Sequence, residues 1–199
     1  ETKIPLPRDF KRSRWEDELT LSRFGSCNTF AFEIADDEPH ADLRVVDVFA
    51  AGIHLTCDDN TVDVPQFLGS LTLDLDRLIA PRDETRDSLP YPDLSPLENH
   101  AQLMAAAEDD NSAYLLHRFM DWGPTADNVS MTFFRDTDAV ALPFSFWRES
   151  HHDHEQLGQV LVATIGIAEL SWTFHRAAWK LMWDWSSLKR NRDGEPLSL

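Results

Sequence analysis

The densest group of chemically active side chains in the sequence is the run His151–Glu155, which holds three histidines and two carboxylates. Neutral imidazole nitrogens and carboxylate oxygens are good ligands for zinc, nickel or copper. A loop that brought His151, His152, His154 and Glu155 around one ion would indicate a metal-dependent enzyme. The HExxH motif is absent, because no helical second histidine follows Glu155. We therefore favour a polar, solvated hairpin loop, and the sequence predicts no cofactor.

No other motif in the sequence indicates catalysis. The seven glycines are dispersed and form neither a GxGxxG nor a GxxxxGK[ST] phosphate cradle, and no GxSxG elbow occurs. Paired acids are present, but most stand at expected turns, where aspartate is favoured because its side chain bonds to the backbone. These pairs are Asp36/Asp37, Asp58/Asp59, Asp74/Asp76 and Asp109/Asp110. The sequence therefore predicts a protein that is not an enzyme.

The charge of the chain restricts its partners. The 199 residues include 18 Lys and Arg against 35 Asp and Glu, which gives a formal net charge of −17 at pH 7. Such a field repels nucleic-acid phosphate and anionic lipid, and it attracts basic partners. We therefore expect no nucleic-acid partner. Solubility alone is the alternative explanation of the charge.

Nothing in the sequence indicates a membrane or secretory protein. No run of 18 apolar residues is present, and Glu1–Phe10 carries charges and prolines in place of an apolar signal core. The two cysteines, Cys27 and Cys57, form no CxxC pair, so we expect free thiols in a reducing compartment. These features predict a cytoplasmic protein with no membrane partner. The absence of an initiator Met leaves open a leader before Glu1.

A long helix within Leu157–Leu188 is expected to organise the fold. At about 100° per residue, its apolar residues fall on one side, which predicts a core face. That face consists of Ile167, Leu170, Phe174, Ala177, Ala178, Leu181, Trp185 and Leu188. Almost diametrically opposite lies a second group, which we call the tryptophan face: Trp172, Arg176, Trp179 and Trp183.

The rest of the chain shows strand and helix patterns in turn. Alternating or β-branched residues predict strands at Thr29–Ile34, Leu43–Phe49, Ile53–Cys57, Tyr114–Trp122, Val129–Arg135, Val140–Trp147 and Gln159–Ile165. Helical periodicity predicts helices at Pro65–Ile79 and Leu97–Ala107. Pro143 fits an edge strand or a bulge. The proline-rich stretch Arg82–Pro96 is expected to be a surface loop or linker.

These elements predict an α+β fold, with a mainly antiparallel sheet, helices packed on it and a long C-terminal helix. We expect an N-terminal arm over residues 1–26, one α+β domain over residues 27–188 and a basic tail over residues 189–199. Both halves run from strands into a closing helix, which suggests an αβ pseudo-repeat. Its halves would be residues 27–80 and 112–188, joined by residues 81–111.

The tryptophan face is the best candidate for a binding surface. Protein interfaces use tryptophan and arginine as anchors, and an acidic surface accelerates capture of a basic partner. The candidate contact residues are Trp172, Arg176, Trp179, Trp183, Asp36, Asp37, Asp58 and Asp59. An exposed patch of this kind is a liability, so coverage by the arm or by a second copy is the alternative. A second copy would make the chain a homodimer or a homo-oligomeric structural module.

Three stretches of the sequence carry a resemblance to a known class of proteins. GSCNTFAFEI, LTCDDNTVDVPQFLGSL and FWRESHHDHEQLGQVLVATIGIAELSWTF, within the small acidic frame of residues 25–185, resemble bacterial immunity proteins that neutralise polymorphic or contact-dependent toxins. The resemblance implies a cytoplasmic α+β protein, not an enzyme, that binds a cognate protein toxin and occludes its active site. A basic nuclease is one candidate toxin. No contact residue transfers by position.

Overall fold

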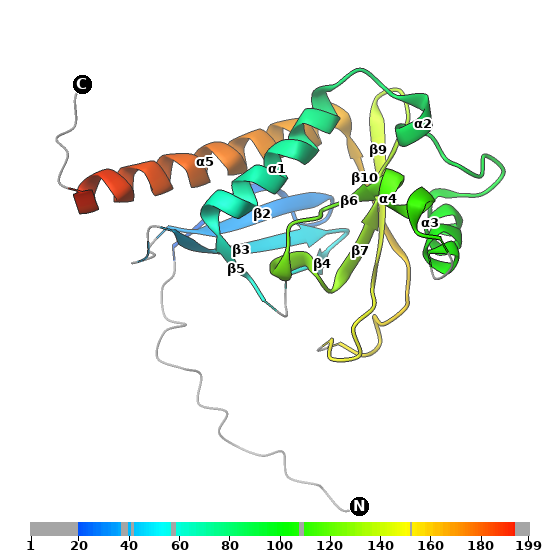
Figure 1. The fold of residues 1–199 in the computed structure, drawn as a ribbon, viewed down its shortest axis with the longest axis horizontal. Coiled ribbons are helices and arrows are strands. Elements are labelled where there is room, and N and C mark those ends of the chain that lie inside the picture. Colours follow the sequence, from blue (N-terminus) through cyan, green and yellow to red (C-terminus); the bar gives the residue numbers. More distant parts are fainter. Residues whose placement is uncertain are drawn as a thin grey trace, which may run out of the picture.

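The computed structural model describes residues 20–36, 40, 42–56, 59–107, 110–151 and 153–193, with side chains to Arg190. Two antiparallel sheets and the helices packed on them form an α+β fold (Figure 1), which confirms the predicted class. The strands divide between two sheets, where the sequence predicted one. No helix within the described residues is long and apolar enough to cross a membrane.

The first sheet comes from residues 21–63. Its strands are β1 (Leu21–Ser26), β2 (Phe30–Ala35), β3 (Leu43–Ala50), β4 (Ile53–His54) and β5 (Thr61–Asp63). Strands β1 to β4 follow one another as antiparallel neighbours, and β5 pairs with β3. Ala51 and Gly52 both have positive φ, as a two-residue type I′ hairpin requires. The predicted strand Ile53–Cys57 is shorter than expected, and Cys57 lies outside the described residues.

The predicted N-terminal arm is wrong over its last residues, which form strand β1. Residues 21–26 pair with β2 along their whole length and belong to the sheet. The charged Arg23 and the glycine at position 25 interrupt the apolar alternation that would have revealed a strand. Gly25 has a φ of +87°, and a Cβ there would lie 2.2 Å from the carbonyl oxygen of Phe30. Residues 1–19, and their expected contact with the tryptophan face, lie outside the described residues.

The second sheet comes from residues 118–166. Its strands are β6 (Arg118–Phe119), β7 (Val129–Thr132), β8 (Phe134–Arg135), β9 (Ala139–Phe146) and β10 (Leu161–Gly166), in the order β10-β9-β7-β6 with β8 also paired to β9. The predicted strand Tyr114–Trp122 is wrong, because residues 112–117 form helix α4 (Ser112–His117) and only β6 follows. A short apolar run does not distinguish a strand from one helical turn.

Pro143 was predicted at an edge strand or a bulge. It lies in a central strand, so the edge position is wrong. Strand β9 pairs with β10 on one side and with β7 and β8 on the other. The pairing of β7 with β9 ends at Met131 and Phe144, and the pairing of β8 with β9 begins at Phe134 and Ala141. Pro143 therefore faces the gap between these two ladders, where Phe133 N–H donates instead to the His117 carbonyl. Since proline has no N–H, the missing ladder bond falls at this interruption.

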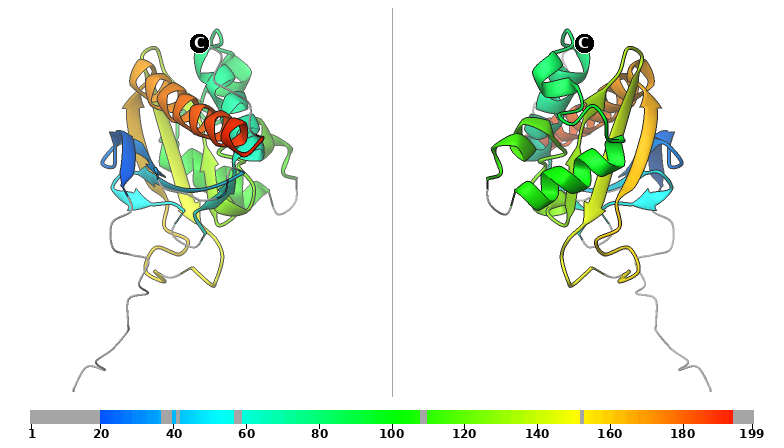
Figure 2. Two further views of the ribbon diagram at one scale, coloured as in Figure 1. Left: turned by 90° about the vertical axis from the view of Figure 1, so that its left-hand side faces the viewer. Right: turned by 90° about the vertical axis from the view of Figure 1, so that its right-hand side faces the viewer.

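Helices cover both sheets. They are α1 (Val64–Ile79), α2 (Glu84–Asp87), α3 (Pro96–Ala106), α4, the 3₁₀ turn η1 (Pro124–Ala126) and α5 (Ile167–Asp193). Helices α1 and α5 lie side by side over the first sheet, and α3 lies against β9 and β10 (Figures 1 and 2). Helix α5 continues five residues into the predicted tail, and α2 interrupts the predicted linker.

An aromatic cluster joins the two halves of the chain, residues 27–80 and residues 112–188. Phe174 of α5 is fully buried, with ring centroids 5.5 Å from Phe30 and 5.2 Å from Phe32 of β2. From the second half, Phe119 and Trp122 lie 5.7 and 5.8 Å from the same ring. Buried apolar residues of both sheets therefore form one continuous core.

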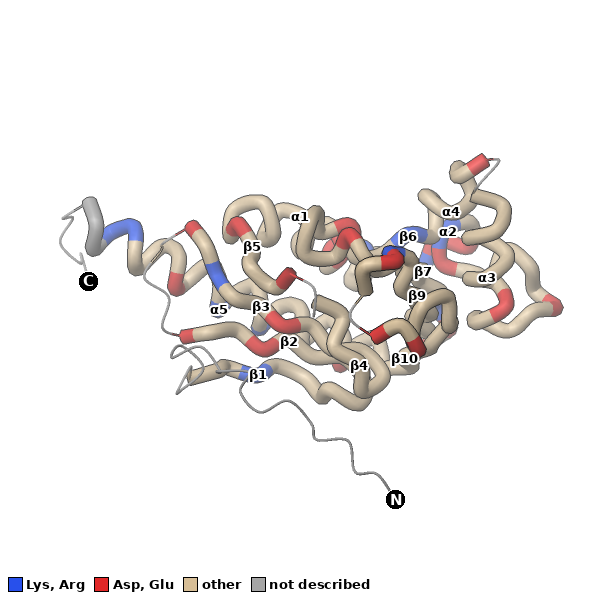
Figure 3. The backbone as a smooth tube through the Cα atoms, turned by 90° about the horizontal axis from the view of Figure 1, so that it is seen from below, with Lys and Arg blue, Asp and Glu red and all other residues tan. Residues whose placement is uncertain are grey.

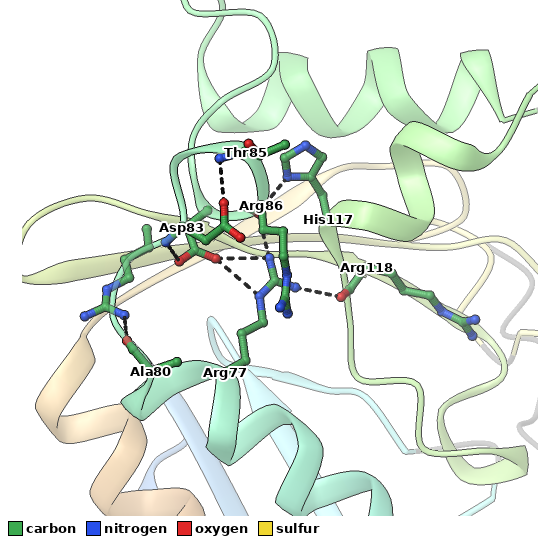
Figure 4. Close-up of polar contacts among 9 residues, drawn as sticks. Arg77, Ala80, Asp83, Thr85, Arg86, His117 and Arg118 are labelled. Atoms are coloured by element: carbon green, nitrogen blue, oxygen red, sulfur yellow. Dashed lines mark hydrogen bonds and ion pairs between the residues drawn. The ribbon is translucent and has the colours of Figure 1, made fainter.

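A buried polar network makes a second connection between the halves (Figure 4). Arg77 of α1 donates to the carbonyl oxygens of Arg118 at 3.0 Å and Arg86 at 2.7 Å, and it pairs with Asp87 at 3.4 Å. Arg135 of β8 donates to the Ala80 carbonyl at 2.9 Å. These bonds satisfy carbonyls at the end of α1 and around α2, and they fix both against the second sheet.

Replacing the central ring should unfold the protein more readily. We expect Phe174→Ala to lower the free energy of unfolding by about 3–5 kcal/mol, because it leaves a cavity where four other rings meet. Leu73→Ala, at a 72% exposed position of α1, should change it by less than about 0.5 kcal/mol. Urea denaturation measures both, and equal effects would contradict the central role of Phe174.

His100 predicts how stability depends on pH. Its ring nitrogens bond to Thr132 Oγ1 at 3.0 Å and Ser145 Oγ at 3.1 Å, and burial lowers its pKa to about 4. The folded state therefore binds fewer protons than the unfolded state between about pH 6.5 and 4, so stability falls as pH falls through that window, by up to about 3 kcal/mol.

The measurement is a comparison of wild type and His100→Gln by urea denaturation from pH 7 to pH 4. Burial raises the pKa of Asp74 to about 6 against the hydrogen bond from Trp122, and protonation of Asp74 on acidification acts in the opposite direction. The difference between the two proteins isolates His100. This difference in the free energy of unfolding should shrink as the pH falls. A difference that stays constant from pH 7 to pH 4 would contradict the lowered pKa of His100.

Candidate protein-binding site

The tryptophan face forms one wall of an open groove. Trp172, Trp179 and Trp183 are 62%, 56% and 57% exposed on α5, and Arg176 between them is also exposed. Together with Phe24 of β1, they line a groove of about 800 Å³. Most of the side chains that line the groove are aromatic and Arg176 lies among them, which is the composition that protein interfaces favour.

Helical geometry explains why these tryptophans point outward. Leu170, Phe174, Ala177 and Leu181 are fully buried at helical spacing, so the opposite side of α5 faces solvent. The prediction that these residues form the buried side of the helix is thereby confirmed. Among the other core-face residues, Ile167, Ala178 and Trp185 are partly buried and pack against the core.

Ring contacts order the groove. The indoles of Trp179 and Trp183 stack with centroids 6.4 Å apart, and Trp172 stacks on His175 at 6.0 Å. The guanidinium of Arg176 lies 5.0 Å from the centroid of the Phe24 ring, in a cation–π contact between helix and sheet. The groove is therefore a preorganised aromatic surface and not a set of independent side chains.

An ion cluster borders the groove. Lys180 Nζ lies 2.7 Å from both Asp36 and Asp184, and Ser22 donates to Asp36 at 2.9 Å. Partial burial acts to raise the pKa of Asp36, but the hydrogen bonds from Lys180 and Ser22 outweigh it and hold that pKa below its ordinary value. Burial likewise opposes the charge of Lys180, yet the two carboxylates raise its pKa. Asp36 and Lys180 are therefore both charged at neutral pH.

The structure brings together some of the predicted contact residues and separates others. Asp36 lies at the tryptophan face through Lys180. Asp59 lies elsewhere, before β5, where its side chain accepts the N–H of Thr61. Asp37 and Asp58 are outside the described residues. Acidic residues are spread along the molecule (Figure 3).

Sequence reasoning missed two groove residues and placed a third only as an alternative. Phe24 was assigned to the arm, whose aromatic residues were expected to cover the tryptophan face if no partner did, and its burial beside α5 places it in the groove wall. His175 and Lys180 lie one position beyond the stripe of the tryptophan face, and helical spacing from Trp172 and Arg176 would have found them. The pairing of Lys180 with Asp36 joins residues far apart in sequence, and no local pattern indicates it.

The residues of the histidine-rich loop differ in how far they are buried. His151 is fully buried, its ring stacked 4.0 Å from that of Phe146, with contacts to Asn128 at 3.0 Å and Gln156 at 3.3 Å. His154 and Glu155 are exposed, and His152 is outside the described residues. Among the residues that the structure describes, no three His, Cys, Asp or Glu side chains are grouped to hold a metal ion.

The fold is that of a solved protein from the contact-dependent inhibition immunity class. That protein is CdiI from Burkholderia dolosa AUO158, which aligns with a TM-score of 0.53 over 80% of this chain and 99% of its own, at 13% identity. The predicted resemblance to immunity proteins is confirmed at the level of the fold. No protein-family model matches the chain, and no curated protein matches it in sequence.

The two histidines should respond differently to mutation. We expect His151→Ala to lower the free energy of unfolding by about 2–4 kcal/mol, because it removes a buried ring and its polar contacts. His154→Ala, at an exposed position, should change it by less than about 0.5 kcal/mol. Thermal unfolding with and without added zinc tests this. A zinc-dependent rise in melting temperature that both variants abolish would instead indicate a metal site.

Proposed function

We propose that this chain is an immunity protein that binds a cognate protein toxin and neutralises it by occluding the toxin's active site. The observation that carries the proposal is the shared fold with CdiI, which extends over 99% of that protein. Because one fold can host several functions, the proposal also draws on the exposed aromatic groove, which has the composition of a protein-binding surface.

In this proposal, charge and aromatic contact act at different ranges. The net charge of −17 attracts a basic toxin, for which a nuclease is a fitting class, and accelerates its capture. Short-range affinity comes from Trp172, Trp179 and Trp183, which lose their solvent contact when the toxin docks. The protein acts in the cytoplasm, where a delivered toxin meets its target, and it acts by binding and not by catalysis.

Truncating one tryptophan should weaken toxin binding strongly. For Trp179→Ala we expect the Kd for the toxin domain encoded beside this gene to rise about 30-fold or more, as at interface hot spots. The matched control is Trp147→Ala, which removes a 57% exposed tryptophan after β9, away from α5, and should leave the Kd within about threefold. Isothermal titration calorimetry measures both values.

Protection in cells provides the second measurement. Wild type and Trp147→Ala should rescue growth of cells that express the toxin domain, and Trp179→Ala should rescue them poorly. Higher ionic strength should slow association, because the steering field is screened. If no toxin domain from the neighbouring gene binds and none is neutralised, the proposed function is wrong. If Trp179→Ala binds as tightly as wild type, only the assigned surface is wrong.

A further inference from the structure

The tryptophan face has the spacing of a coiled-coil seam. Trp172, Arg176, Trp179 and Trp183 are separated by four, three and four residues, which is the alternation of a and d positions in a heptad. Glu169 at one end of α5, and Ser186 and Arg190 at the other, extend the same alternation. This spacing repeats every 3.5 residues on the exposed side of the helix, and it is the pattern that packs against a second helix.

The order of residues along the seam is self-complementary when two helices run antiparallel. A two-fold axis between positions 177 and 178 places Trp172 of one copy opposite Trp183 of the other, and Arg176 opposite Trp179. Each a position then meets a d position, as in antiparallel coiled coils. The central layers are cation–π contacts between copies, and the flanking layers are pairs of indoles.

The charges at the ends of the seam also favour the antiparallel arrangement. Glu169 is exposed in the first turn of α5, and Arg190 lies in its last turns, seven residues after Trp183. With the axis between positions 177 and 178, antiparallel helices place Glu169 of one copy opposite Ser186 of the other, which is one helical turn, about 6 Å along the axis, from Arg190. The long side chains of Glu169 and Arg190 span that offset, twice in each dimer. Parallel helices would place like charges together.

The exposed area is sufficient for a weak, specific dimer. At their measured exposures, the six tryptophans of two copies present roughly 850 Å². Arg176, Met182 and the charged ends bring the buried total to about 1,200 Å², the lower limit for specific interfaces. At this lower limit of size, and with two acidic copies that repel one another, we expect a dissociation constant on the order of 10 µM.

We propose that the partner of the tryptophan face in the absence of toxin is a second copy of this chain, packed through α5 in an antiparallel coiled coil. The dimer covers the residues that the proposed function assigns to toxin binding. Capture of toxin then requires dissociation of the dimer, a step that rests on the proposed function. Dimerisation itself does not, and the chain alone tests it.

The first test is sedimentation velocity of the full chain across protein concentrations. Wild type should dimerise with a Kd on the order of 10 µM, and Trp179→Ala should raise that Kd at least 30-fold, because the substitution removes two symmetric contacts. Trp147→Ala, equally exposed but off the seam, should leave it within about twofold. A wild type that stays monomeric to about 200 µM, or a Trp179→Ala dimer as tight as wild type, would overturn the proposal.

A charge swap tests the antiparallel direction. Glu169→Arg or Arg190→Glu alone should weaken the dimer about three- to tenfold, since each substitution replaces two attractions with two repulsions. The double variant should recover a Kd within about twofold of wild type. Failure of the double variant to recover while both single variants weaken the dimer would rule out this pairing.

Salt dependence separates dimerisation from toxin capture. Each copy carries a net charge of −17, so the copies repel one another and screening should tighten the dimer. The N-terminal arm is the other possible occupant of the groove. A monomeric wild type that dimerises on Trp15→Ala would assign the groove to the arm and would overturn the proposal. Toxin binding without any dimer would leave the proposed function standing.

Discussion

The structure depends on the packing of one helix against both halves through a single aromatic cluster. Phe174 contacts Phe30 and Phe32 of the first sheet on one side and Phe119 and Trp122 of the second half on the other. Once the position of the Phe174 ring is fixed, the rotation of the whole 27-residue helix about its own axis is fixed with it. The tryptophans on the opposite side are therefore held outward by the core, and the candidate binding surface needs no separate scaffold.

The features of the fold that the sequence predicted correctly are those that depend on local periodicity. The long helix, its buried side and most strands of the first half follow from spacing alone. Three features required information that is not local. Strand β1 is recognisable only through its pairing with β2, helix α4 occupies an apolar run too short to identify, and the split into two sheets depends on which strands find each other. Pro143 was predicted at an edge or a bulge, and the break in the ladder beside it depends on strands that are distant in the sequence.

The candidate site divides in the same way. Trp172, Arg176, Trp179 and Trp183 share one helix, so their common face was predictable, whereas Phe24 and the ion cluster of Asp36, Lys180 and Asp184 bring distant segments together. The histidine-rich loop shows the limit of composition as a guide. One of its histidines is a stacked core residue, and burial, which the sequence does not reveal, separates it from its neighbours.

The acidic charge and the aromatic groove would select different properties of a binding partner. The acidic residues are spread over the molecule, so their combined field acts at a distance and has little power to select one contact geometry. The groove acts only on contact, and two of its bordering carboxylates are already paired with Lys180. A basic partner would therefore be attracted by the whole surface but selected by apolar groups that fit between the indoles. An arginine-rich surface without such groups would meet this chain often and stay bound briefly, because charge raises the rate of encounter while buried aromatic contact sets the rate of release.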